Sequence, residues 1–137
     1  MKPIEFNTAK KIAETLNKKE WRYWKHCDYI YDANDSNKLM HFADQIADDY
    51  LLNRKDYYPA PYPFEVIDYL ENEFKWAIYV TPRFDGFDRS HHDTYFEICK
   101  IGEVGGRDYS SDAHVGDRYE SMNRAIIEVC DLINNKK

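Results

Sequence analysis

The chain is poor in the residues that build repetitive or cross-linked proteins. It has 5 Gly and 5 Pro and no long repeat, which excludes the collagen-like and low-complexity classes. Its three cysteines, Cys27, Cys99 and Cys130, are odd in number and form no C-x-x-C pair. A disulfide framework and a structural zinc site are therefore not expected, and no cofactor is predicted.

Long apolar runs are also missing. No run approaches the roughly 18 residues of a membrane span, so the sequence predicts no membrane partner. No apolar segment follows Met1, Lys2 and Pro3, so no signal peptide is predicted either. With these signals absent and no disulfide framework, the expected location is the reducing cytoplasm.

Aliphatic residues are scarce, and aromatic residues compensate for them. Leu, Ile, Val and Phe together number 29 of the 137 residues, just above the share at which disorder is expected. The chain also has 12 Tyr and 3 Trp. Its length suits one domain, and the core of that domain is expected to be built partly from rings with polar tips.

Charge is unevenly spread along the chain. The net charge is −6, which argues against nucleic-acid binding by the whole domain. Residues 1–25 nevertheless carry seven Lys or Arg against three Glu, a net +4, which leaves −10 for the remainder. The basic segment 10–25 is either a solvated helix face or a nucleic-acid surface in which aromatic rings alternate with basic residues.

Helical spacing of apolar residues predicts four helices, over about 8–19, 37–53, 63–74 and from 117 onward. Asp32 to Ser36 provides the cap expected before the second helix, and Pro63 is well placed as the first residue of the third. Asp117-x-x-Glu120 resembles a capping box at the start of the last helix. Residues 21–31 show no clear periodicity and are left open between helix and strand.

Alternation predicts two strands, over 75–81 and 93–101, with a polar loop at 82–92 and a weaker third strand at 107–111. Trp76, Ile78 and Val80 share one face, which is expected to pack on the last helix. The fold class is α+β in two layers: a small antiparallel sheet of two to three strands on a C-terminal helix, with a helical N-terminal half.

One domain is predicted over 1–137. Within it, residues 1–57 are expected to be helical, and the alternating prolines of 58–63 form an extended connector. Residues 64–137 supply the helix, the strands and the final helix.

Motifs for catalysis are absent. There is no G-x-S-x-G elbow and no phosphate loop, and the adjacent side chains of His26, Cys27 and Asp28 diverge too far to form a triad. This favours a binding role over catalysis. The alternative is a metal-dependent hydrolase or metal-binding protein, in which loops bring four imidazole and carboxylate ligands together. These candidate ligands are His91, His92, Asp112 and His114.

Aromatic residues next to basic residues or prolines are the candidate partner-binding residues, because Tyr, Trp and Arg dominate interface hot spots. They are Trp21, Arg22, Tyr23, Trp24, Tyr58 and Tyr62. The alternative is that these rings fill the core of a domain with few leucines.

The C-terminal half also resembles known proteins. Its proline and aromatic segment, short helix and strands precede a final helix with the pattern Tyr119-x-Ser121-x-x-x-Ala125-Ile126. Over about Tyr58–Ile133 this order is similar to uncharacterised small α+β proteins of bacteria, their phages and mobile elements. The resemblance implies an accessory protein and no particular activity.

These observations lead to one favoured hypothesis. The chain is expected to be a small protein-binding module, of phage or mobile-element type, that acts by occupying the surface of a partner, for example as an inhibitor. The metal-dependent protein and nucleic-acid binding through 10–25 are the alternatives. A homodimer is compatible with the sequence.

Overall fold

The structure is a computed structural model that describes residues 2–16, 24–33, 37–41, 57–85, 88–102, 107–110 and 117–135. The chain divides into two compact units, Met1–Glu65 and Val66–Lys137. The boundary lies two residues after the end of the predicted connector. The prediction that 1–137 forms one domain stays a prediction.

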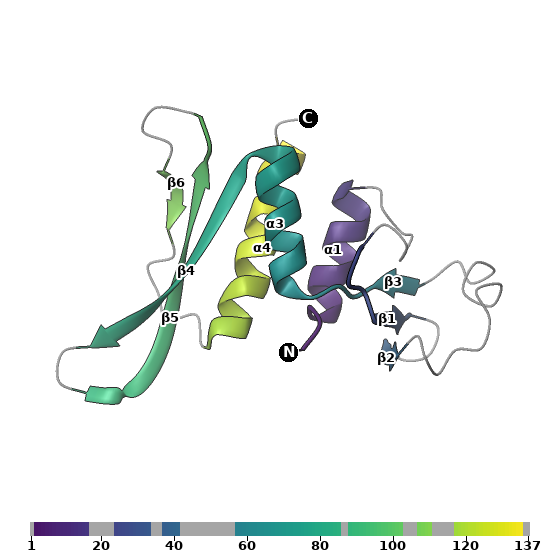
Figure 1. Cartoon of the computed structure of the whole chain (residues 1–137), viewed down its shortest axis with the longest axis horizontal. Helices are drawn as coiled ribbons and strands as arrows, with labels where there is room; N and C mark the ends of the chain where they lie inside the picture. The colour runs from purple at the N-terminus through teal and green to yellow at the C-terminus, as the bar shows by residue number, and fades with distance from the viewer. Residues whose placement is uncertain are drawn as a thin grey trace. The chain divides into compact units, whose positions relative to one another are not determined.

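The described residues of the first unit combine helix α1 with a small sheet (Figure 1). Helix α1 spans Phe6–Leu16, and the strands are β1 (Tyr29–Asp32), β2 (Lys38–His41) and β3 (Tyr57–Pro59). The strands are antiparallel in the order β2-β1-β3, and α1 contacts β3. This unit therefore has both kinds of secondary structure, and the helical N-terminal half that the sequence predicted is only partly observed.

Phe6 joins the helix of the first unit to its sheet. The Phe6 ring meets Tyr31 and Tyr58 edge-on, with ring centroids 5.5 and 5.8 Å apart. The Tyr31 hydroxyl donates a hydrogen bond of 2.8 Å to the Ile4 carbonyl. Edge-to-face pairs of this kind add specific stabilisation to the burial of the rings. Aromatic side chains thus fill a part of this core that aliphatic side chains fill in most proteins.

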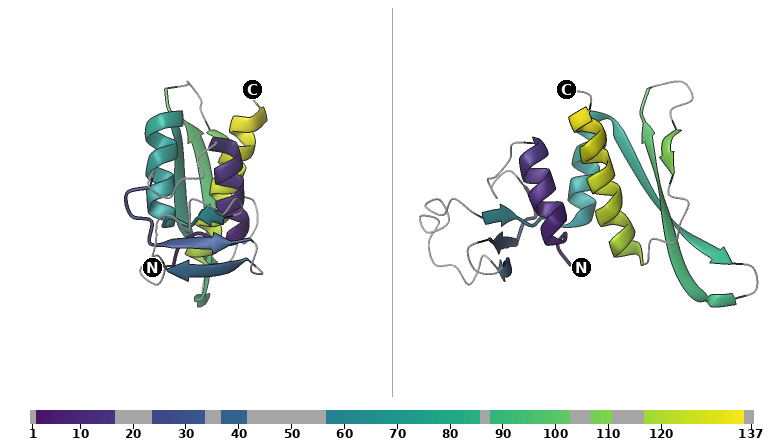
Figure 2. Two further views of the ribbon diagram at one scale, coloured as in Figure 1. Left: turned by 90° about the vertical axis from the view of Figure 1, so that its right-hand side faces the viewer. Right: turned by 180° about the vertical axis from the view of Figure 1, so that it is seen from behind.

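The second unit is a two-layer α+β arrangement (Figure 2). Helix α3 spans Pro63–Phe74 and leads into β4 (Trp76–Asp85), β5 (Asp88–Lys100), β6 (Arg107–Ser110) and α4 (Arg118–Asn135). The strands are antiparallel in the order β4-β5-β6, and α4 contacts β4 and β5. The predicted fold class, an antiparallel sheet packed on a C-terminal helix, is confirmed.

Apolar side chains from both layers form the core of this unit. Trp76 and Ile78 on β4 are buried, as predicted for the face that packs on the last helix. On the opposite face Tyr79 is 55% exposed, whereas the small Ala77 is buried as well. Among the residues whose burial is described, the buried apolar ones of this unit are Val66, Leu70, Trp76, Ala77, Ile78, Phe96, Ile98, Ala125, Ile126, Val129, Cys130 and Ile133.

Polar groups are also buried where α4 begins. The Asp117 carboxylate accepts a hydrogen bond of 2.8 Å from the Glu120 amide, which confirms the predicted cap. The Thr94 hydroxyl donates to the Asp117 carbonyl at 3.0 Å and is hydrogen-bonded to the Ser121 hydroxyl. Buried hydroxyls with partners avoid the cost of an unsatisfied polar group, so β5 is linked to α4 by more than apolar contact.

The predicted helix over 37–53 is wrong at its start, because Lys38–His41 forms strand β2. Asn37 has a φ of 58°, in the left-handed region that Asn tolerates better than most residues. The chain reverses before this residue, and Asp32 is paired with Lys38 in the β1–β2 register. Asp32, the first residue of the predicted cap, therefore belongs to strand β1, and residues 34–36 lie outside the described residues. Residues 42–53 lie outside the described residues.

Two further boundaries differ from the prediction. Residues 57–59 of the connector form strand β3, where Pro59 ends an edge strand and so interrupts no central ladder. The predicted loop 82–92 belongs largely to β4 and β5, whose pairing continues past Arg83 and Asp93 to Asp85 and Asp88. Backbone hydrogen bonds continue an antiparallel ladder without apolar side chains, so alternation underestimates the length of the strands.

The remaining predicted elements agree with the structure. The third helix has the predicted bounds, and Lys75, with a φ of 60°, ends it directly before β4. Tyr29–Asp32 is a strand, which decides part of the segment left open. Among the residues described, no helix combines the length and the apolar character that crossing a membrane requires.

Candidate functional site

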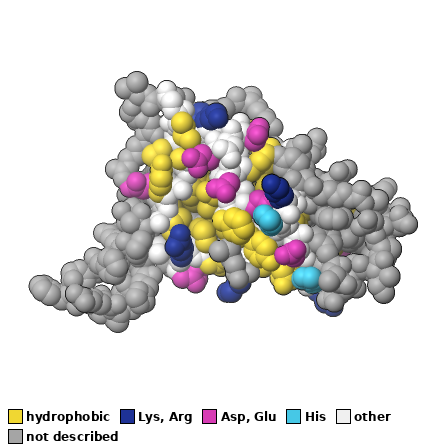
Figure 3. All heavy atoms as spheres, in the orientation of Figure 1, with side chains coloured by type: hydrophobic (Ala, Val, Ile, Leu, Met, Phe, Trp, Pro, Cys, Tyr) yellow, Lys and Arg dark blue, Asp and Glu magenta, His cyan; other side chains and the backbone are white. Residues whose placement is uncertain are grey.

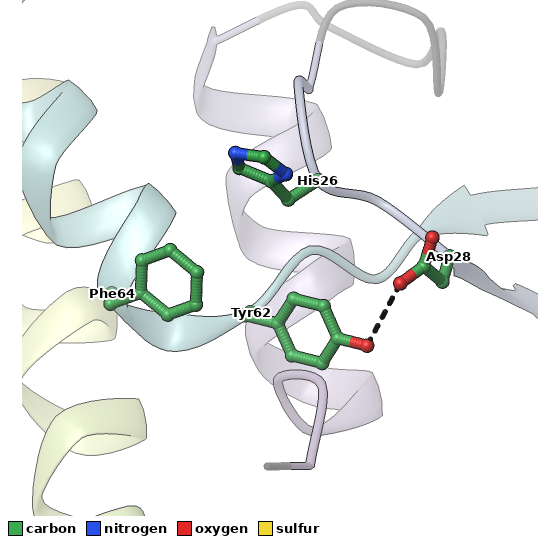
Figure 4. A pocket seen from close by; sticks show the side chains of 4 residues that line it. All are labelled: His26, Asp28, Tyr62 and Phe64. Atoms are coloured by element: carbon green, nitrogen blue, oxygen red, sulfur yellow. Dashed lines mark hydrogen bonds between the residues drawn. The ribbon is translucent and has the colours of Figure 1, made fainter.

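An open pocket of about 290 Å³ lies in the first unit and is lined by His26, Asp28, Tyr62 and Phe64 (Figure 4). Two of these residues precede β1, and the other two flank the start of α3. The pocket thus lies between two segments that are more than thirty residues apart in the sequence.

Pro63 shapes one side of the pocket. It is the first residue of α3, where its missing N–H and fixed φ are favourable. The Glu65 amide donates a hydrogen bond of 3.1 Å to the Tyr62 carbonyl, so Tyr62 lies just outside the helix and Phe64 just inside it. Their rings lie nearly parallel, with an interplanar angle of 7° and centroids 5.9 Å apart. The two rings together form an aromatic shelf, the Tyr62–Phe64 shelf.

Glu65 holds the opposite side of the pocket in place. Its carboxylate accepts hydrogen bonds from the backbone amides of Lys25 and His26, the second at 2.9 Å. Hydrogen bonds to a charged acceptor are stronger than neutral ones. One side chain at the start of α3 therefore positions the turn that carries His26.

The polar groups of the pocket are coupled to its aromatic shelf. The Tyr62 hydroxyl donates a hydrogen bond of 3.0 Å to Asp28 Oδ2, and this bond to a carboxylate raises the pKa of the Tyr62 phenol. The His26 ring faces Phe64 at a tilt of 41°, with centroids 6.4 Å apart. In Figure 4 the carboxylate lies beyond the tyrosine hydroxyl, and the imidazole lies above the shelf.

Cys27, between two lining residues, is turned away from the pocket into the protein. It is 8% exposed, and its Sγ donates to the Tyr29 carbonyl at 3.2 Å. Burial is the main reason that its thiol pKa is raised to about 12. The thiol therefore stays protonated and is a poor nucleophile, in agreement with the absence of a triad from adjacent residues.

The exposed hydrophobic surface of this region is continuous with the pocket. Phe64 is 43% exposed, so part of its ring reaches the surface beside the pocket. On the face drawn in Figure 3, hydrophobic side chains reach the surface over the segment that joins β3 to α3, with a histidine and acidic side chains beside them.

The predicted partner-binding residues lie in different environments. Tyr62 lines the pocket, whereas Trp24 is 5% exposed and lacks the free ring area that a hot spot needs. Tyr58 is half-buried and contacts Phe6, which is the core role weighed as the alternative. Trp21, Arg22 and Tyr23 lie outside the described residues, so their role stays a prediction.

The sequence reasoning did not find His26, Asp28 or Phe64 as site residues. The available signal for Phe64 was an aromatic residue directly after a helix-starting proline, off the apolar stripe of the third helix. No local signal indicated His26 and Asp28, because their approach to the shelf depends on a contact across about forty residues.

The described residues do not assemble the predicted metal site or the predicted nucleic-acid surface. His91 and His92 belong to β5, and Asp112 and His114 lie outside the described residues. Within the ranges that the structure describes, no three His, Cys, Asp or Glu side chains could hold a metal ion. For the basic segment 10–25, α1 ends at Leu16 and residues 17–23 lie outside the described residues. The metal and nucleic-acid alternatives therefore stay predictions.

Replacing Glu65 should loosen the turn beside the pocket without leaving a cavity in the apolar core. We expect Glu65→Ala to lower the free energy of unfolding of the first unit by about 1–3 kcal/mol, because two amides lose a charged acceptor. Hydrogen exchange read at single amides should show faster exchange at Lys25 and His26. Glu73→Ala, an exposed carboxylate on the same helix, is the matched control. Unchanged protection of both amides would show that Glu65 does not hold this turn.

Comparison with known proteins gives no relative from which a role for the pocket residues could be inferred. No protein-family model, curated protein or solved structure matches the chain.

Proposed function

We propose that the chain is a small protein-binding module and that the Tyr62–Phe64 shelf, with the pocket beside it, is its contact surface. The observation that carries the proposal is the exposed Phe64 ring, which lies parallel to Tyr62 at the edge of an open pocket. Large exposed apolar groups beside a hollow are characteristic of interaction sites.

The rigidity of the shelf supports the same proposal. Pro63 fixes the backbone between the two rings, Asp28 holds the Tyr62 hydroxyl, and Glu65 holds the facing turn. Binding to a surface that is already ordered loses less conformational entropy than binding to a mobile one. Aromatic side chains in such a setting are the usual anchors of protein interfaces.

The acidic character of the chain restricts the kind of partner. With a net charge of −6, the protein repels nucleic acid and acidic surfaces at long range and attracts basic ones. In its narrower form, the proposal is that the protein is a phage or mobile-element accessory protein that inhibits a partner by covering it. The reason for this narrower form is the predicted order of elements over residues 58–133 described above.

The test compares two exposed aromatic positions in the tagged protein. Phe64→Ser and Tyr79→Ser remove rings that are 43% and 55% exposed on different units, so both should leave the circular dichroism spectrum and thermal midpoint nearly unchanged. Each variant is used to capture partners from the cells that make the protein, and the captured proteins are quantified by mass spectrometry.

We expect one captured protein to fall at least about tenfold with Phe64→Ser, the loss expected of an interface anchor, and to persist with Tyr79→Ser. A partner that both variants retain, or that only Tyr79→Ser loses, would overturn the assignment of the contact surface. Capture of no protein in stoichiometric amount by the wild-type chain would overturn the proposal itself.

A further inference from the structure

We infer that the pocket lined by His26, Asp28, Tyr62 and Phe64 receives an arginine side chain of the partner protein. This inference rests on the proposed function and specifies the chemistry by which the same site recognises its partner. It depends on three properties of the pocket: its size, the flat aromatic shelf and the carboxylate beside the shelf.

The size of the pocket suits one side chain. At about 290 Å³ and open to solvent, it lies at the lower limit of the cavities that enclose small molecules and cofactors, which begin near 300 Å³. An extended side chain that enters from a partner needs no enclosure, because the rest of the partner covers the opening.

The shelf favours a flat cation. Aromatic faces attract positive charge through the ring quadrupole, and a planar guanidinium can also stack on them. Tyr62 and Phe64 are stacked, with an interplanar angle of 7° and centroids 5.9 Å apart, so a flat group can lie parallel to both rings and stack on an outer face of the pair. Phe64 is 43% exposed, which leaves ring area for this contact.

Asp28 supplies the matching negative charge. Asp28 is the one acidic residue among the four that line the pocket, and its side chain is exposed. Oδ2 accepts the Tyr62 hydroxyl at 3.0 Å, which orients the group and leaves acceptor capacity for a ligand. A guanidinium that stacks on the shelf could donate N–H bonds to this carboxylate, whereas an ammonium can form the ion pair but cannot stack.

The start of α3 does not reverse this preference. A helix N-terminus carries the equivalent of about half a positive charge, which opposes a nearby cation. The Glu65 carboxylate lies in the first turn of α3, and Asp28 adds a second negative charge beside the pocket. Two full negative charges outweigh the partial charge of the helix.

The test uses the full chain and three short peptides that differ at one side chain: acetyl-Gly-Arg-Gly-amide, the same peptide with lysine, and the same peptide with citrulline. Citrulline has nearly the shape of arginine without its charge. Binding is followed by chemical-shift changes of the Tyr62 and Phe64 ring protons, which report weak affinities in the millimolar range. Asp28→Asn is the key variant, because asparagine can still accept the Tyr62 hydroxyl.

We expect the arginine peptide to bind at least about fivefold more tightly than the lysine peptide and about tenfold more tightly than the citrulline peptide. Asp28→Asn should weaken arginine binding by about tenfold, and Glu73→Gln, far along α3 and exposed, should leave it unchanged. Equal binding of arginine and citrulline, equal binding of arginine and lysine, or no shift of either ring would overturn the inference.

These outcomes are separable from those of the proposed function. If the peptides fail while capture of a partner still depends on Phe64, the shelf is a contact surface for another kind of side chain and only the arginine assignment is wrong. If capture is independent of Phe64, the proposed contact surface is wrong whatever the peptides do.

Discussion

Trp76→Ala is expected to destabilise the second unit by about 3–5 kcal/mol, since it removes the largest fully buried side chain in the described part of the chain. Trp76 is 1% exposed at the first position of β4. Small domains have unfolding free energies of only about 5–15 kcal/mol, so the variant should lie close to its unfolding transition at room temperature.

Part of this loss comes from a contact outside the apolar core. The Lys100 ammonium lies 4.9 Å from the centroid of the Trp76 ring and donates a hydrogen bond of 2.7 Å to the Phe74 carbonyl. The indole thus supports the lysine that caps the end of α3. Trp76→Phe keeps a ring in this position and should cost less than half as much as Trp76→Ala.

Urea unfolding followed by far-ultraviolet circular dichroism measures both effects, since tryptophan fluorescence changes with the substitution itself. Tyr79→Ala is the control on the same strand, because Tyr79 is 55% exposed and its loss should cost at most about 1 kcal/mol. Equal losses for Trp76→Ala and Tyr79→Ala would contradict the placement of Trp76 in the core.

The second large effect is an alkaline loss of stability that depends on Cys27. Its thiol pKa is raised from 9.0 to about 12 in the folded chain, first of all by burial. Above pH 9 the unfolded chain releases this proton while the folded chain keeps it, so stability falls as the pH rises toward 12. Well below pH 9 both states hold the proton, so Cys27 does not contribute to the pH dependence of the free energy of unfolding.

The slope approaches about 1.4 kcal/mol per pH unit for a single group, so we expect Cys27 to contribute a loss of about 1–2 kcal/mol between pH 9 and pH 10.5. The measurement compares urea midpoints of the wild type and Cys27→Ala at pH 8, 9, 10 and 10.5. The variant should start lower, because a buried atom is lost, but its midpoint should change less with pH. Parallel curves for the two proteins would contradict a buried, protonated thiol.

Local sequence signals predicted the elements whose causes are local. Helix α3 has its predicted bounds because Pro63 sets its start and its apolar residues recur at helical spacing. The cap of α4 was also visible, since Asp117 and Glu120 lie three positions apart and the bond forms within one turn. Such features need no information from the rest of the chain.

The predictions that were wrong concern segments whose secondary structure depends on pairing with another strand. Lys38–His41 has the apolar spacing of a helix continuing to residue 53, but pairing with β1 makes it a strand. In the same way, residues 57–59 become a strand because β1 offers its other edge. The pocket depends on two such contacts at once, so the sequence pointed to Tyr62 among its lining residues but not to Asp28 or His26.

The bond between Glu65 and the Lys25–His26 turn has a consequence for the timing of synthesis. A ribosome adds about 5–20 residues per second, so the 39 residues that follow His26 up to Glu65 take roughly 2–8 s to make. During that interval the turn exists without its acceptor and the shelf does not yet exist. The Lys25–His26 turn and the Tyr62–Phe64 shelf can therefore come together only after Glu65 has left the ribosome.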